Sequence, residues 1–305
     1  MLLSYEEFKE EVKRNFVGYM PKKYQSMSVL IKPTEKVNRV CDALCLNEGE
    51  VRPTVYLDEM YKQYTFGKNF DSVVEDAAKK MIIGYEQIPN VDVKNIMRDK
   101  RKITFQLVNT EQNQKMLADI PHREFNDLSI IYRYIIDSET DKGVQSFVIT
   151  NKVAAELKLN EKELYNLAMT NTKKLFPPVV HTMQDLLAQM GMSSIDLSVP
   201  VPMYIITNEC NVHGATSILY NDVIYDLANK LDTNLYLLPS SIHEVIAIPF
   251  NSKSFSKSLK DLEEMVYAVN MDQVDVSDRL SNEVYFYDKK TRKLSLATNT
   301  KKKLA

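Results

Sequence analysis

The sequence predicts an α+β fold in which antiparallel or mixed sheets pack against helices. Strand-like segments occur in neighbouring pairs along the chain, and helix-like segments separate the pairs, whereas a regular βαβ alternation is missing. The 305 residues are 44% hydrophobic and 26% charged, which is the ordinary composition of a globular protein. A chain of this length can bury a sizeable core and needs neither disulfides nor a metal to fold.

The first third of the chain shows the pairing pattern. Ser4 and Glu7 make a capping box ahead of apolar residues at helical spacing, which predicts an opening helix. A proline-containing turn is expected between the first two strands. The predicted segments are the helix 4–17, the strands 25–32 and 37–46 with their turn at 33–36, the extended piece 51–57, and the helices 58–66 and 71–84.

The rest of the chain continues in the same way. Pro121 ends one helix, Asn160 caps another, and the charged residues 288–292 form the turn of a final hairpin. The predicted strands are 103–107, 128–136, 145–150, 203–207, 234–238, 244–248, 284–287 and 294–296, with a turn at 139–143. The predicted helices are 110–119, a short one from Asn151, 161–175, 181–190 closed by Gly191, 215–230 with a break near Asn221, and 256–270.

The polar stretch around residues 88–120 is the best candidate for a domain boundary in the chain. No linker rich in proline, serine or glycine divides the sequence. We therefore expect either one packed unit or two lobes with a soft boundary near residue 120. In the second case, residues 1–120 form an N-terminal α+β lobe and residues 121–305 form a C-terminal one.

Scarce glycine excludes several nucleotide- and ester-binding classes. The chain has 7 glycines, and no two of them lie closer than 17 positions. A dinucleotide fingerprint, a P-loop and a nucleophile elbow all need closely spaced glycines, because the backbone must turn tightly or approach a ligand. No cofactor is therefore expected.

The number and spacing of cysteines and histidines, together with the net charge, exclude further kinds of protein. The three cysteines form no disulfide framework, and the four histidines lack the spacing of a zinc site, so a reducing compartment and no metal are expected. No apolar segment is long enough to cross a membrane, and the N-terminus lacks the pattern of a signal peptide, which indicates a cytoplasmic protein. The net charge is −2 and no basic stripe stands out, which disfavours nucleic acid as a partner.

The most suggestive segment runs from Leu237 to Val245. It places Ser240, Ser241, His243 and Glu244 at the corner between two predicted strands. Nucleophilic catalysis needs a serine within reach of a base and an acid that orients the base. Glu244 projects to the opposite side of a strand from His243, so it cannot easily orient that imidazole. A polar hairpin loop, whose hydroxyls satisfy backbone groups, is the alternative interpretation.

A second polar cluster precedes a predicted strand. His122, Arg123 and Glu124 combine a base, a guanidinium and a carboxylate. An arginine fork can hold a phosphate or carboxylate ligand, although such a run is more often a local salt-bridge network. A third polar segment, residues 208–215, predicts either an anion-facing loop or a capping loop with a left-handed glycine.

These blocks resemble an uncharacterised bacterial family, the domain-of-unknown-function family five-six-eight-eight. The resemblance rests on Thr54–Asp58, on Ile120–Glu124 with Asp127 and Leu128, and above all on LLPSSIHEV at Leu237–Val245. It covers nearly the whole chain and implies an intracellular bacterial setting, a possible mobile-element context and no known activity. It also implies an asparagine in relatives where this chain has His213. The half after residue 120 is distantly similar to the uncharacterised family fourteen-forty-four.

Three hypotheses for function follow. The first is a non-enzymatic binding protein for an unknown protein or a small anionic ligand, because no cofactor fingerprint, metal spacing or complete local triad is present. The second is a hydrolase or anion-binding enzyme in which the serine corner meets His122, Arg123 and Glu124 across a cleft. The third is a nucleic-acid-associated protein of a mobile element. The sequence leaves open whether the protein is an enzyme.

Overall fold

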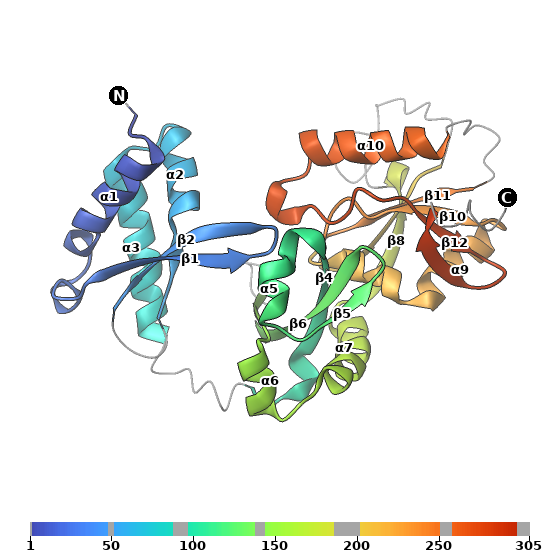
Figure 1. Cartoon of the computed structure of the whole chain (residues 1–305), viewed down its shortest axis with the longest axis horizontal. Coiled ribbons are helices and arrows are strands. Elements are labelled where there is room, and N and C mark those ends of the chain that lie inside the picture. The colour runs from blue at the N-terminus through green and yellow to red at the C-terminus, as the bar shows by residue number, and fades with distance from the viewer. Residues whose placement is uncertain are drawn as a thin grey trace. The chain divides into compact units, whose positions relative to one another are not determined.

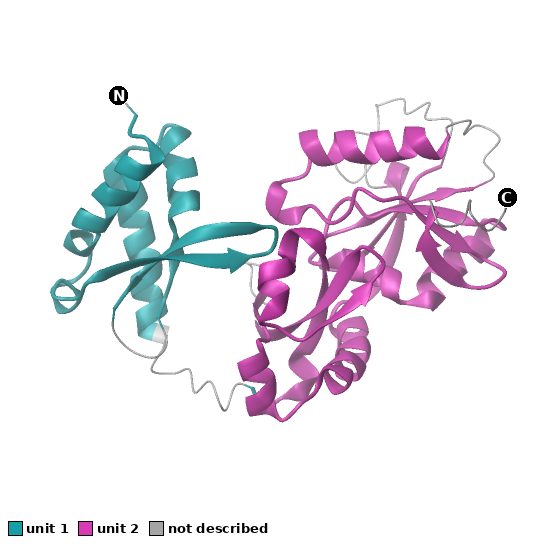
Figure 2. Cartoon of the chain, viewed as in Figure 1, with its two compact units in different colours: residues 1–98 teal, residues 99–305 magenta. Residues whose placement is uncertain are grey.

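A computed structural model divides the chain between Arg98 and Asp99 into two units, unit 1 (Met1–Arg98) and unit 2 (Asp99–Ala305) (Figure 2). The structure describes residues 2–47, 52–87, 97–137, 144–185, 202–250 and 258–297. The division lies earlier than the expected boundary near residue 120. The reason is that strand β4 (Ile103–Asn109) pairs with β6 (Leu128–Asp137), which places β4 in unit 2.

Unit 1 begins with the helix that the capping box predicts. The Ser4 hydroxyl accepts the Glu7 backbone N–H, and the Glu7 carboxylate accepts the Ser4 backbone N–H at 2.8 Å. Two N–H groups that a helix start leaves free are thereby satisfied. Phe8, Val12 and Phe16 then enter the core of unit 1. The helices of this unit are α1 Tyr5–Asn15, η1 Phe16–Tyr19, η2 Lys22–Tyr24, α2 Leu57–Thr65 and α3 Phe70–Gln87.

The sheet of unit 1 corrects one predicted turn. Its strands are β1 Val29–Lys36, β2 Arg39–Leu46 and β3 Val55–Tyr56, in the order β1-β2-β3. Pro33 lies inside β1 opposite Asp42, so the turn predicted at 33–36 is wrong. The chain reverses instead at residues 37–38, where Asn38 adopts a φ of 60°. An edge strand tolerates proline, and asparagine tolerates the left-handed backbone that a two-residue hairpin needs.

The first sheet of unit 2 has an edge that helix α7 (Glu161–Leu175) protects. The Thr172 hydroxyl accepts the Phe105 backbone N–H at 3.2 Å, and the Asn171 amide donates to the Ile103 carbonyl at 3.0 Å. These side chains satisfy backbone groups that an edge strand would leave free. The sheet has the order β4-β6-β5, with β7 also paired to β6. The remaining elements are β5 His122–Phe125, β7 Gln145–Val148, η4 Lys100–Lys102, η5 Glu111–Asn113, α5 Gln114–Ala118 and α6 Asn151–Leu157.

The second sheet of unit 2 has six strands in the order β13-β12-β10-β11-β9-β8. Helix α10 lies along one face of this sheet (Figure 1), where its Leu262 and Val266 share a core with Leu238, Ile248 and Val284. The elements are β8 Pro178–Thr182, β9 Tyr204–Asn208, η6 Gly214–Leu219, α9 Asn221–Lys230, β10 Leu235–Leu238, β11 Val245–Pro249, α10 Leu259–Asp272, η7 Val276–Asp278, β12 Tyr285–Asp288 and β13 Lys293–Leu296.

The predicted α+β class is confirmed, because the strand pairs that the structure describes are antiparallel and helices pack against them. One helix prediction is partly wrong. His181 lies in strand β8, opposite Ile205 of β9, and helical structure begins only after Thr182. Residues 186–190 of that prediction, its closing Gly191 and the turn predicted at 139–143 lie outside the described residues.

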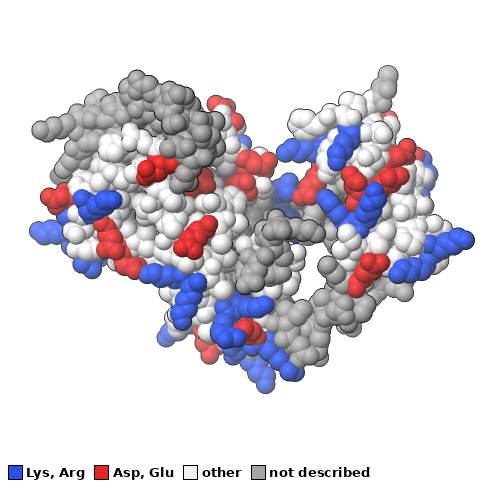
Figure 3. All heavy atoms as spheres, turned by 180° about the vertical axis from the view of Figure 1, so that it is seen from behind, with Lys and Arg blue, Asp and Glu red and all other residues white. Residues whose placement is uncertain are grey.

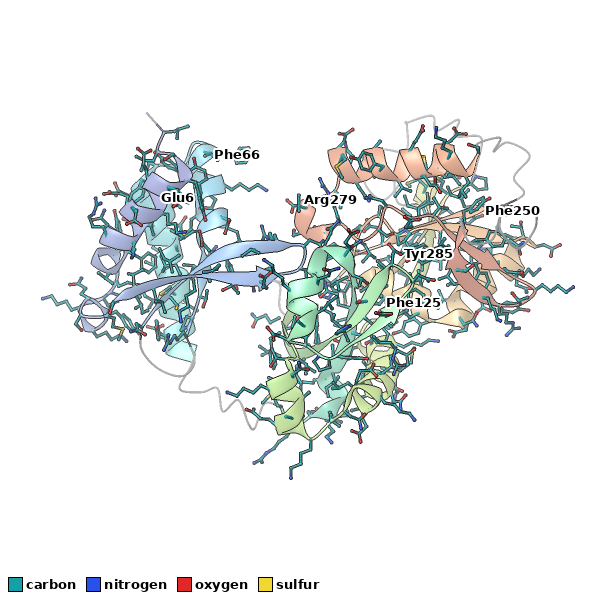
Figure 4. All side chains as sticks on the ribbon, viewed as in Figure 1. Glu6, Phe66, Phe125, Phe250, Arg279 and Tyr285 are labelled. Carbon is teal, nitrogen blue, oxygen red and sulfur yellow. The ribbon has the colours of Figure 1, made fainter. Side chains whose placement is uncertain are left out.

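Asp127 joins the two sheets of unit 2. This residue follows β5, and its carboxylate accepts the Ser281 hydroxyl at 2.6 Å and the hydroxyl of Tyr285 on β12. Burial raises the pKa of Tyr285, and the nearby carboxylate of Asp127 raises it further, so this hydroxyl keeps its proton as a donor. Phe125 stacks on the same tyrosine with ring centroids 6.4 Å apart (Figure 4). Asn109 adds a bond from its amide to the Leu280 carbonyl at 3.0 Å.

Replacing Asp127 with alanine is expected to lower the free energy of unfolding by about 2–4 kcal/mol, because the Tyr285 hydroxyl would stay buried without its acceptor. Urea denaturation followed by circular dichroism measures this. Asp119→Ala is the matched control, since the exposed Asp119 side chain makes no hydrogen bond in the described part of the chain, and it should change stability by less than about 0.5 kcal/mol. Equal effects of the two substitutions would contradict the role of Asp127.

Candidate functional site

Three loop segments meet at one end of the six-stranded sheet and form what we call the serine–histidine corner. They are residues 208–214 after β9, 239–244 between β10 and β11, and 275–281 before β12. Backbone bonds hold them together. The Ile242 N–H donates to the Asp278 carbonyl at 2.8 Å, and the Ala215 N–H donates to the Ile242 carbonyl at 3.2 Å. The corner therefore depends on three segments that are distant in sequence.

The two serines of the corner are structural in their contacts. Ser240 and Ser241 are both buried, and the Ser241 hydroxyl accepts the backbone N–H of His243 at 3.0 Å. The Ser240 carbonyl accepts the Leu280 N–H at 2.9 Å. The Ser241 contact is that of a polar loop whose hydroxyl satisfies a backbone group, which is the alternative to a nucleophile.

The imidazole of His243 has partners that the local sequence did not indicate. Its Nδ1 lies 3.1 Å from the Asn211 carbonyl and 3.3 Å from the His213 backbone nitrogen. Its Nε2 lies 3.7 Å from a carboxylate oxygen of Asp278, and its ring stacks on that of His213 at 6.1 Å between centroids. Glu244 makes no hydrogen bond or ion pair in the described part of the chain, as expected from its projection away from His243.

These contacts do not form a serine–histidine–acid relay among the described residues. Asp278 supplies a carboxylate near His243, but the Ser241 hydroxyl is bonded to the backbone rather than to the imidazole. A general base must lie within hydrogen-bond reach of the proton that it removes. The corner as it stands therefore offers a rigid polar loop cluster and no prepared nucleophile.

Gly214 and His213 show how tightly the corner is packed. A β-carbon at Gly214 would lie 2.2 Å from the Thr207 hydroxyl and 2.3 Å from the His243 carbonyl, which leaves no room for any other residue. His213 adopts the left-handed backbone conformation with a φ of 53°. The preceding loop is closed by Asn208, whose side chain accepts the Cys210 N–H and donates to the Val212 carbonyl. These bonds support the capping-loop alternative for residues 208–215, but the left-handed glycine expected there is wrong, because Asn211 and His213 adopt the left-handed backbone instead of Gly214.

The imidazole of His213 is held neutral. Burial, and to a smaller extent the nearby Arg133 and His243, together lower its pKa to about 3. Arg133 lies on β6, where its guanidinium donates to three neutral oxygens of Ser146 and Gln106. Burial lowers the pKa of Arg133 to about 10. In the described residues, Arg133 has no carboxylate partner.

The second predicted cluster lies on strand β5, and its arginine is neutralised. Arg123 forms a two-pronged ion pair with Glu161 of α7, with both N–O distances at 2.9 Å, and its guanidinium lies 3.7 Å from the centre of the Tyr165 ring. Burial would raise the pKa of Glu161, but hydrogen bonds from Arg123 and Tyr132 outweigh it, so this pKa is lowered. Arg123 is therefore engaged in a local salt bridge, which is the alternative to an anion-binding arginine for this cluster.

The other members of this cluster make few contacts. The Nδ1 of His122 lies 3.0 Å from the Ile120 carbonyl, and Glu124 is exposed. Within the described residues, no hydrogen bond or ion pair connects His122, Arg123 or Glu124 with Ser240, Ser241, His243 or Glu244. The contacts thus give no support to a single site that both clusters share.

A third location, which the sequence prediction missed, is a cavity of about 630 Å³ in unit 2 that we call the hairpin cavity. It lies between α9, the β12–β13 hairpin and the end of β5. Its apolar lining comes from Phe125, Ile218, Leu219, Ile224, Phe286 and Leu294. Ligand sites in proteins have volumes of about 300–1,000 Å³ and a mostly apolar lining with a few placed polar groups, and this cavity fits that description.

The polar side of the hairpin cavity is basic. Arg292 and Lys293 line it, and neither forms an ion pair in the described residues. The Arg292 guanidinium lies 3.5 Å from the centre of the Tyr225 ring on α9. Asp288 also lines the cavity, but one of its oxygens accepts the backbone N–H groups of the hairpin turn, at Lys290 and Thr291. The sequence signal that could indicate this site is the charged turn at residues 288–292, which local sequence alone identifies only as a hairpin turn.

The described residues hold no cluster of three histidine, cysteine, aspartate or glutamate side chains that could bind a metal ion. Cys41 and Cys45 are free and buried, and Cys210 is free and exposed. Within the same residues, no helix has both the length and the apolar character that crossing a bilayer requires.

Comparison with known proteins assigns the chain to a family. A family model described as a family of unknown function (DUF5688) matches residues 5–289. The resemblance to family five-six-eight-eight is thereby confirmed. No curated protein and no solved structure matches the chain. The distant similarity of the C-terminal half to family fourteen-forty-four stays a prediction.

The substitution Gly214→Ala is expected to destabilise the protein by about 2 kcal/mol or more, because its methyl group would overlap a backbone carbonyl and the chain must shift. Gly18→Ala is the matched control, since nothing lies within 4 Å of a β-carbon there. Thermal unfolding of both variants measures the difference. An alanine at 214 that is tolerated as well as one at 18 would show that the corner is loosely packed.

His213 is expected to make stability fall at acid pH. The folded-state pKa of about 3 lies below the unfolded value of about 6.5, so the unfolded chain takes up a proton that the folded chain excludes. This contribution is fully present above pH 6.5 and is lost as the pH falls towards 3. Wild type should lose about 1–2 kcal/mol more than His213→Asn between pH 6.5 and 5. Asparagine tolerates the left-handed backbone at this position. Parallel urea-denaturation profiles of the two proteins would contradict an imidazole that is held neutral in the folded protein.

Proposed function

The chain belongs to DUF5688, a family of unknown function, and we propose that it is a non-enzymatic binding protein that takes a small anionic ligand in the hairpin cavity. The observation that carries this proposal is the position of Arg292. Its guanidinium is exposed at the rim of a ligand-sized cavity, is stacked on Tyr225, and has no carboxylate partner in the described residues.

The stacking prepares Arg292 for an oxyanion. A guanidinium that lies flat on an aromatic ring keeps its N–H edge available, and that edge matches the two oxygens of a carboxylate or phosphate. The backbone of the same residue is also fixed, because the Asn221 amide donates to the Arg292 carbonyl at 3.2 Å. The other end of that amide accepts the Tyr287 hydroxyl at 2.7 Å. Side chains held in place before binding lose less entropy when the ligand arrives.

Other arginines of unit 2 differ from Arg292, because their guanidinium groups bond protein oxygens. Arg123 pairs with Glu161, Arg101 pairs with Asp99, and Arg279 donates to the Met271 and Val274 carbonyls at the end of α10. A guanidinium already satisfied by protein oxygens has little left for a ligand. This contrast favours the hairpin cavity over the cluster at residues 122–124 that the sequence suggested.

The proposal also places the protein in the cytoplasm of a bacterium. Three free cysteines support a reducing compartment, and the bacterial setting rests on the family resemblance. Basic and acidic side chains lie side by side over both units on the face that Figure 3 shows, so the charge of that face does not favour a nucleic acid. A hydrolase centred on Ser241 is not favoured, because its hydroxyl bonds a backbone N–H.

The test is a thermal-shift screen of organic phosphates and carboxylates at millimolar concentration. At least one compound should raise the unfolding temperature of the wild type, because a ligand that binds only the folded state stabilises it. Arg292→Gln should lose most of that shift. Arg101→Gln is the matched control, since Arg101 is an exposed arginine of the same unit that pairs with Asp99, and it should keep the shift. No stabilising anion, or equal shifts in both variants, would overturn the proposal.

A further inference from the structure

The hairpin cavity has a second property that restricts the chemical class of its ligand. Its lining also includes apolar side chains from four elements, namely Phe125 of β5, Leu219 of η6, Ile224 of α9 and Leu294 of β13. A site for an inorganic ion needs only a few donors around the ion. A volume of about 630 Å³ exceeds what such an ion would fill and suits an organic molecule.

We infer that the ligand is an amphipathic organic anion, with a carboxylate or phosphate head at Arg292 and an apolar body over the lining of α9 and β13. This inference rests on the proposed function and adds the chemistry of the rest of the molecule. The two parts of the ligand meet two different parts of the cavity, so each can be tested by its own variant.

The head group is placed by charge. Arg292 and Lys293 are consecutive in the hairpin, and both line the cavity without an ion pair in the described residues. The neighbouring Lys289 is different, because it pairs with Asp232 at 2.6 Å. Asp288 is the acidic group of the lining, and one of its oxygens is bonded to two N–H groups of the turn. The cationic end of the cavity is therefore the hairpin turn.

The apolar body is placed by shape. Ile218 of η6 and Ile224 of α9 are buried, while Leu219 and Leu294 are only partly buried. Partly buried apolar side chains gain further burial when an apolar ligand covers them. Removing one methylene of ligand from water improves affinity by roughly fourfold where the fit is good.

The experiment compares four probes with the full-length protein by isothermal titration calorimetry. Octyl phosphate and octanoate combine an anion with an apolar chain, while inorganic phosphate lacks the chain and octanol lacks the charge. The expected result is that at least one of the two amphipathic anions binds about tenfold or more tightly than both single-feature probes. The better of the two identifies the head group.

Two variants separate the contributions. Arg292→Gln should weaken the amphipathic anion about tenfold and leave octanol unchanged. Leu294→Thr, which keeps a strand-forming residue on β13, should weaken the amphipathic anion severalfold and leave inorganic phosphate unchanged. Circular dichroism and the unfolding temperature of each variant establish that it is folded.

The outcomes that overturn the inference differ from those that overturn the proposed function. Equal affinity for octyl phosphate and inorganic phosphate, both dependent on Arg292, would refute the apolar body and keep the anion site. Equal affinity for octyl phosphate and octanol, with no effect of Arg292→Gln, would refute the anion site itself. Absence of binding by all four probes in a folded protein would refute both.

Discussion

The carboxylate of Asp127 is the contact on which the arrangement of unit 2 depends. It receives hydroxyl groups from Ser281 and Tyr285, and these come from a segment more than a hundred residues away in the chain. The bonds fix β12 beside the turn that follows β5. Because Phe125 stacks on Tyr285 and also lines the hairpin cavity, the same contact brings a residue of the first sheet to a cavity formed mainly by the second.

Charge in unit 2 is distributed according to burial. The half-buried Arg123 has a carboxylate partner, and the deeply placed Arg133 is held by three bonds to neutral oxygens. His213, close to that cation, stays neutral. A charge taken out of water needs such compensation, whereas an exposed one does not. Arg292 lies at the rim, and its contact with an aromatic ring orients it without neutralising it.

Local sequence predicted the elements well where a local interaction defines them. The capping box at Ser4 and the N-cap at Asn160 each start the helix that they indicate, and the strands on both sides of Pro239 form as predicted. Predictions failed where pairing decides the outcome. Pro33 lies in an edge strand that tolerates it, and His181 lies in a strand because β9 is its neighbour. The partner of His243, Asp278, belongs to a segment that only folding brings near.

The sequence by itself determined the α+β class, the positions of most helices and strands, and the lack of any glycine-rich phosphate cradle, because these depend on residue type and spacing over a few positions. Only the tertiary structure decided which polar residues are available to a ligand. The Ser241 hydroxyl accepts a backbone N–H and Arg123 pairs with Glu161, while Arg292 borders a cavity and has no ion-pair partner among the described residues. Hydrogen-bond satisfaction and burial depend on distant segments, so no short pattern encodes them.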